Sequence, residues 1–130
     1  MKKRIITARK APAAVGPYSH AVVAGPLVFV SGQIPINQQG EIVEGDIVVQ
    51  TVQVLENLKT ILEATDLGLK DVVKTTVFLA DMADFAEMNR VYGEFFPSEP
   101  PARSTVQVSR LARNAAVEIE AVALRKDWLK

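Results

Sequence analysis

The chain of 130 residues has no cysteine, a single histidine and no long apolar run. The absence of cysteine excludes disulfides, thiolate nucleophiles and thiolate metal sites, and it fits a reducing compartment. A single histidine, His20, excludes a histidine dyad or a multi-histidine metal site within one chain, and we interpret it as structural. Chemistry here must therefore use a guanidinium, carboxylates, hydroxyls, amides and water.

Net charge is also lacking, because 15 lysines and arginines balance 15 aspartates and glutamates. This balance disfavours broad attraction to nucleic acid or to an anionic membrane, although a local basic patch stays open. No apolar run reaches the ~18 residues that span a bilayer, and the N-terminus lacks the apolar region of a signal peptide. We expect a cytoplasmic protein with a single domain over residues 1–130 and a sizeable core.

Apolar and β-branched residues recur with the spacing of strands and helices. The predicted strands cover residues 18–24, 27–31, 72–79, 102–108 and 117–124, preceded by a short strand within residues 2–7. Asp46 predicts the N-cap of a helix that runs to about Thr65, with Gly68 as its stop. A second helix is predicted from near Asp84 to before Pro97. The order is therefore β, β, α, β, α, β, β after the short first strand.

The two predicted helices have apolar faces that should pack on the sheet. These faces are Val48, Val52, Leu55, Leu58 and Leu62 in the first helix, and Phe85, Met88, Tyr92 and Phe95 or Phe96 in the second. Two helices cover only one face of the sheet. In the predicted strand over residues 27–31, Val28 and Val30 point to one face and Leu27 and Phe29 to the other, so both faces of the sheet are apolar there. No other segment can cover the second face, so we expect self-association with the sheets facing inward.

Arg103 lies in a predicted strand in which Arg103, Thr105 and Gln107 share one face. Two interpretations stay open for this residue. It forms a structural ion pair with Glu118 or Glu120, or its planar fork binds a carboxylate or phosphate through two parallel hydrogen bonds.

Glu118 and Glu120 share one face of the last predicted strand, opposite Val117 and Ile119. If the last two strands form an antiparallel hairpin with Thr105 opposite Glu118, Arg103 and Glu118 are diagonal neighbours about 7–8 Å apart. That spacing admits a compact anion and a water. One of the like-charged glutamates would have a raised pKa and act as a general base; singly, each resembles a solvated surface residue.

Four further features are candidates for a site. Asn89 falls within the apolar stripe of the second helix, where a buried amide either braces a loop or points at a ligand. Tyr18 is a core or interface aromatic, or an acid catalyst. Ser31-Gly32-Gln33 ends a strand, where a hydroxyl and free backbone amides could face a small anion. Asp81 and Asp84 are typical of turns and helix caps.

Taken together, the motifs resemble those of the RidA family, also called YjgF/YER057c/UK114, over nearly the whole chain. The matching segments are residues 11–21 (APAAVGPYSHA), 31–35 (SGQIP), 73–79 (VKTTVFL), 89–92 (NRVY) and a signature from Pro101 to Ile119 that includes Ala102-Arg103-Ser104 and Val117-Glu118-Ile119.

The resemblance implies an α+β, chorismate-mutase-like fold, with a mixed β-sheet and two helices on one face. It further implies homotrimers whose sheets face inward and whose sites lie in clefts between subunits. The implied activity is hydrolysis of 2-imino acids, tautomers of reactive enamines, to 2-oxo acids and ammonia, with no cofactor and no metal.

The resemblance also implies roles for individual residues. Arg103 would hold the substrate carboxylate, and Glu118 would position or activate the hydrolytic water. The expected substrate-binding residues are Tyr18, Ser31, Gly32, Gln33, Asn89, Arg103 and Thr105. Two positions depart from the family pattern, since Thr105 stands where many members have Cys and Ala112 where Pro is frequent.

Other functions remain as alternatives to the deaminase. One is a non-catalytic sensor or regulator that binds 2-oxo acids or similar metabolites in the same cleft, because a fold does not fix a function. Another is a ribonuclease or translation inhibitor, which zero net charge and the lack of an aromatic-basic stripe disfavour. A chaperone role is a third.

Overall fold

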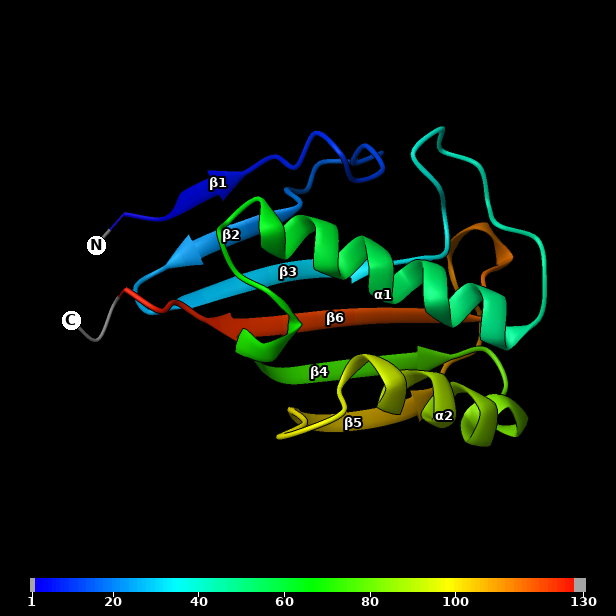
Figure 1. Ribbon diagram of the computed structural model, residues 1–130. Coiled ribbons are helices and arrows are strands. Elements are labelled where there is room, and N and C mark those ends of the chain that lie inside the picture. Colours follow the sequence, from blue (N-terminus) through cyan, green and yellow to red (C-terminus); the bar gives the residue numbers. More distant parts are fainter. Residues whose placement is uncertain (1, 128–130) are drawn as a thin grey trace.

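The computed structural model describes residues 2–127 as a six-stranded sheet with two helices packed on one face (Figure 1). The strands are β1 (Arg4–Ile6), β2 (Ala21–Ala24), β3 (Leu27–Gln33), β4 (Val72–Leu79), β5 (Ala102–Gln107) and β6 (Val117–Leu124). The helices are α1 (Ile47–Glu63) and α2 (Phe85–Phe95), and three short 3₁₀ turns span Leu69–Asp71, Met82–Asp84 and Ala112–Asn114. The predicted order of elements and the α+β class are confirmed.

The strand order in the sheet is β1-β2-β3-β6-β4-β5. β4 and β5 are parallel, whereas all other neighbouring pairs are antiparallel. The predicted hairpin between the last two strands is therefore wrong, because β4 lies between them. A parallel pair needs a crossover, and α2 supplies it between β4 and β5, which leaves β5 at the edge of the sheet.

Helix α1 begins as predicted, since the Asp46 carboxylate accepts a hydrogen bond from the Val49 amide at 3.1 Å. Its buried face is rotated from the predicted one, because Val54 and Ile61 are fully buried whereas Val52 is 38% exposed. The helix packs against α2 as well as against the sheet. The buried face of α1 is therefore set by these two contacts and not by the regular spacing of apolar residues alone. Gly68 does not end α1, which stops at Glu63; it precedes the turn Leu69–Asp71.

Helix α2 buries Met88, Val91 and Tyr92. Asn89 is exposed, so its predicted burial in an apolar stripe is wrong. The helical turn that presents Met88 and Val91 to the core leaves the neighbouring Asn89 on the solvent side.

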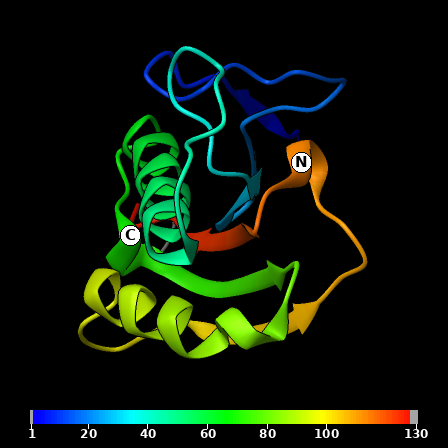
Figure 2. The same ribbon diagram turned by 90° about the vertical axis from the view of Figure 1, so that its right-hand side faces the viewer.

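The core fills the space between the sheet and the two helices, which lie on the same side of it (Figure 2). Alternation along β6 sends Val117 and Ile119 into this core, where both are fully buried. The opposite face, termed the open face, carries Glu118 and Glu120 together with apolar residues. Phe29 is 45% exposed there and Val106 42%. No helix within residues 2–127 is long and apolar enough to cross a membrane.

Candidate functional site

Arg103 lies on β5 and faces helix α2. It is paired across the parallel ladder with Thr75 of β4, which is fully buried beneath α2. Its guanidinium carbon lies 4.8 Å from the centroid of the Tyr92 ring and 5.7 Å from that of Phe85. Within residues 2–127 it forms no ion pair, so the structural pairing with Glu118 or Glu120 is absent.

The aromatic contacts determine what the guanidinium can do. Cation–π contacts of this kind contribute about 0.5–2 kcal/mol and favour the charged group in its position over the rings. The N–H donors of arginine lie in the plane of the group and form a rigid fork. A guanidinium that lies over aromatic rings and has no ion pair in the described chain keeps N–H donors available for two parallel hydrogen bonds to a carboxylate.

Thr105 and Asn89 belong to the same two elements as this arginine and its aromatic rings, β5 and α2. Thr105 shares the α2-facing side of β5 with Arg103, and its buried hydroxyl has no hydrogen-bond partner within the described chain. Asn89 is four residues after Phe85 and three before Tyr92, so it lies on the helical face that carries both rings. We refer to Asn89, Arg103 and Thr105 as the arginine half-site.

Glu118 lies on the open face, on the other side of the sheet from Arg103. Burial raises the pKa of its carboxyl group, and the nearby negative charge of Glu120 raises it further. A Cβ placed on Gly32 would overlap the Glu118 carboxylate. The carboxylate therefore rests directly against the backbone at the end of β3, and only glycine at position 32 leaves the Glu118 side chain in this place.

Ser31 and Gln33 fix this end of β3. The Ser31 hydroxyl donates to the Ser19 carbonyl at 2.5 Å, and the Ser31 amide donates to the His20 carbonyl at 3.0 Å. The Gln33 side chain is buried and donates to the Ser31 carbonyl at 3.1 Å, so it braces the strand end. Tyr18 precedes β2 in an exposed loop, and its hydroxyl accepts from the Val15 amide at 3.3 Å. We refer to Tyr18, Ser31, Gly32 and Glu118 as the glutamate half-site.

His20 holds the loop that carries Tyr18. Its buried ring accepts from the Ala8 amide at Nδ1 (2.9 Å), and Nε2 lies 2.7 Å from the Pro12 carbonyl. Since Nδ1 accepts, Nε2 carries the proton and donates. Both ring nitrogens are used within the protein, in agreement with the structural interpretation of this residue.

The two half-sites do not meet within one chain. Arg103 is level with Thr75 of β4, whereas Glu118 is level with Phe78, three residues further along. Strands lie about 4.8 Å apart and advance about 3.3 Å per residue, so two strand spacings and three residues separate the two Cα atoms by roughly 14 Å. The side chains also point to opposite faces. The predicted diagonal proximity is therefore wrong for a single chain.

Comparison with known proteins identifies the family. The family model described as endoribonuclease L-PSP matches residues 8–125. The chain belongs to this family. It is the RidA/YjgF family that the sequence motifs resemble.

Relatives in this family match the chain almost end to end. A RutC family protein of Pyrococcus horikoshii is 54% identical over 95% of this chain and 99% of its own length. The mouse protein named 2-iminobutanoate/2-iminopropanoate deaminase is 43% identical over 98% of this chain and 96% of its own. The crystal structure of Escherichia coli TdcF with bound serine superposes with a TM-score of 0.90 at 46% identity, covering 95% and 99% of the two chains.

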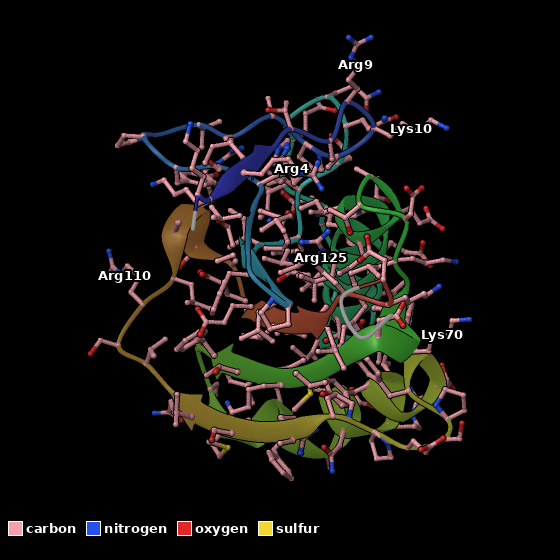
Figure 3. All side chains as sticks on the ribbon, turned by 90° about the vertical axis from the view of Figure 1, so that its left-hand side faces the viewer. Arg4, Arg9, Lys10, Lys70, Arg110 and Arg125 are labelled. Atoms are coloured by element: carbon pink, nitrogen blue, oxygen red, sulfur yellow. The ribbon has the colours of Figure 1, made fainter. Side chains whose placement is uncertain are left out.

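Endoribonuclease activity, which the family description names, would require a basic surface that binds RNA. Of the six basic side chains labelled in Figure 3, Arg9 and Lys10 are neighbours in sequence, whereas the others come from different parts of the chain: Arg4, Lys70, Arg110 and Arg125. They project in different directions, whereas RNA binding without base readout uses a continuous basic surface.

Sequence reasoning missed the role of Phe85 and Tyr92. Both were assigned to the buried stripe of the second helix, but their rings also carry Arg103. Their spacing of seven residues places them on one helical face. The missing information was that this helix crosses over to the strand that contains Arg103.

Proposed function

We propose that this protein hydrolyses short 2-imino acids, with 2-iminopropanoate and 2-iminobutanoate as substrates, to 2-oxo acids and ammonia. The observation that carries the proposal is Arg103, a guanidinium that lies over the Tyr92 and Phe85 rings with no ion pair inside the described chain. Such a group suits a small carboxylate. The name of the mouse relative supports the reaction type.

The proposed site needs a second copy of the chain. Arg103 and Glu118 lie on opposite faces of one sheet, and the open face exposes Phe29 and Val106. We expect a homotrimer with the open faces turned inward, in which the β5 edge of one copy lies beside the open face of the next. Each cleft then combines the arginine half-site of one subunit with the glutamate half-site of its neighbour.

The chemistry follows from these groups. Arg103 binds the substrate carboxylate, and Thr105 and Asn89 line the same wall. Glu118 accepts a proton from water as the oxygen adds to the imine carbon, and it passes this proton to the imine nitrogen to give the carbinolamine. Glu118 then takes the hydroxyl proton of the carbinolamine and delivers it to the nitrogen, so that the carbonyl forms and ammonia leaves. Orientation of substrate and water provides the remaining acceleration, because imines already react with water.

Tyr18, Ser31, Gly32 and Gln33 complete the proposed pocket. Ser31 and Gly32 lie at the strand end against which the Glu118 carboxylate rests. Gln33 acts through the backbone that it braces. Tyr18 is tied to this end through the neighbouring Ser19 carbonyl, which accepts from Ser31.

The deciding experiment is an assay with 2-iminopropanoate generated in situ by an amino-acid oxidase or dehydratase. We expect the protein to accelerate formation of pyruvate and ammonia above the rate in buffer. Serine bound to TdcF favours a second function, the binding of small amino-acid-like metabolites without turnover. Saturable binding of pyruvate with no acceleration of imine hydrolysis would identify that function instead.

Complementation between subunits tests the shared cleft. Arg103→Ala and Glu118→Gln chains, each expected to have little activity alone, are co-expressed with different affinity tags and purified as mixed oligomers. Random mixing leaves about one quarter of the clefts with both wild-type groups, so about one quarter of wild-type activity should return. If the site were built within one chain, no activity would return in the mixed oligomers. Sedimentation of the wild-type protein as a monomer would also contradict the shared cleft.

A further inference from the structure

Tyr92 connects three elements of the fold beneath the candidate site. Its hydroxyl lies 2.7 Å from the Thr75 hydroxyl in a buried hydrogen bond between α2 and β4. Thr75 is fully buried, and Tyr92 is only 5% exposed. The ring face lies under Arg103 of β5.

Two contacts hold this ring in place. The hydroxyl is anchored to Thr75, and the Phe96 ring packs against it with centroids 4.6 Å apart. Thr75 is also the residue level with Arg103 across the parallel ladder. The anchor, the ring and the guanidinium are therefore adjacent, each supplied by a different element.

The protonation state of Tyr92 supports the same arrangement. Burial raises the pKa of its hydroxyl above the usual value of a phenol, although the Thr75 hydrogen bond and the charge of Arg103 act in the opposite direction. The hydroxyl consequently stays neutral at physiological pH. A neutral phenol can take part in a hydrogen bond with Thr75 as donor or acceptor.

We propose that Thr75 and Tyr92 are positioning residues for Arg103. The Thr75–Tyr92 hydrogen bond fixes the ring, and the ring fixes the plane of the guanidinium so that its edge faces the carboxylate of the substrate. Neither residue contacts the substrate. This role rests on the proposed function of Arg103 as the carboxylate-binding group.

A cation held over aromatic rings has fewer orientations than one on a free side chain, so less freedom is lost when the substrate binds. Loss of the ring should therefore weaken carboxylate binding and leave the chemical step largely unchanged. The expected signature is a rise in KM with little change in kcat.

Four variants separate positioning from stability. Tyr92→Phe and Thr75→Val each remove one hydroxyl and leave the other buried and unpaired, whereas the double variant removes both. Tyr92→Met removes the ring face but keeps an apolar side chain. Val91→Ala is the matched control, since Val91 is buried in the same helix and is not among the aromatic contacts of Arg103.

We expect Tyr92→Met to raise KM for 2-iminopropanoate about 3- to 30-fold. Tyr92→Phe and Thr75→Val should each raise it about 2- to 10-fold. The double variant should match either single variant in KM, because one hydrogen bond is lost in all three, while it regains thermal stability. Val91→Ala should lose stability and keep the wild-type KM.

Two further measurements distinguish failure of this role from failure of the proposed function. The Kd for pyruvate reports carboxylate binding without turnover, so it should follow the same order among the variants even if the imine is not hydrolysed. The NMR signals of the Arg103 side chain should show a ring-current shift that becomes smaller in Tyr92→Met, in which only the more distant Phe85 ring remains. An unchanged shift, or wild-type KM and Kd in Tyr92→Met, overturns the proposal.

Discussion

Replacing Arg103 with alanine is expected to lower kcat/KM for 2-iminopropanoate about 10- to 150-fold, the loss that follows from removing hydrogen bonds to a charged group worth roughly 1.5–3 kcal/mol. The side chain has no ion-pair partner within residues 2–127. Its removal therefore leaves no opposite charge stranded in the protein. The fold and the oligomer should persist, with a small loss of stability from the missing stack on Tyr92 and Phe85.

Two further substitutions refine this prediction. Arg103→Lys keeps the charge but loses the planar fork and most of the stacking, so it should recover only part of the activity. Arg110→Ala is the control for net charge, because Arg110 lies exposed in the segment between β5 and β6 (Figure 3). If Arg103→Ala lowered kcat/KM by only a few per cent, Arg103 would not be the group that binds the substrate carboxylate.

The elements of the fold were predictable because each has a local signal. Asp46 caps α1 through its carboxylate, and β-branched residues mark β4. The pairing of the strands was not predictable in the same way. Placing β6 between β3 and β4 depends on contacts far apart in sequence, which alternation and turn signals do not specify.

In the candidate site, too, local features could be predicted from the sequence and long-range placement could not. Alternation along β5 and β6 correctly grouped Arg103 with Thr105 and Glu118 with Glu120. It could not tell which face of either strand turns toward α2, so Arg103 and Glu118 were expected side by side. Within one chain Arg103 and Glu118 are separated because β4 lies between their strands and because their side chains point to opposite faces of the sheet. The same geometry makes a second subunit necessary to the proposed site.

The second large effect is expected for Glu118→Gln, which should lower kcat about 10²- to 10⁴-fold, as removal of a general acid–base group does. KM should change little, because the substrate carboxylate is proposed to bind to Arg103. Glu120→Gln is the control, since it neutralises the neighbouring exposed carboxylate on the same strand face. Unchanged kcat in Glu118→Gln would instead indicate a structural glutamate.

The pH dependence gives an independent check on Glu118. Its pKa is raised above the ordinary value of 4.5, so the rate should fall as the pH drops through that raised pKa and the base becomes protonated. Glu120→Gln should move this limb to lower pH, because it removes one cause of the shift.

A raised carboxyl pKa also favours the folded state at low pH, and this contribution is lost as the pH rises through the folded pKa. Glu118→Gln should consequently be more stable than the wild type at neutral pH.

Gly32→Ala tests the same carboxylate without changing it. A Cβ at this position would overlap Glu118 Oε2, and the backbone of Gly32 has no positive φ that alanine would strain. The Glu118 side chain must therefore move away from the end of β3. We expect a fall in kcat that approaches that of Glu118→Gln, with a folded oligomer in both. Gly93→Ala is the matched control, because nothing lies within 4 Å of a Cβ there. A wild-type kcat in Gly32→Ala would mean that the position of the Glu118 carboxylate against the end of β3 does not matter for the reaction.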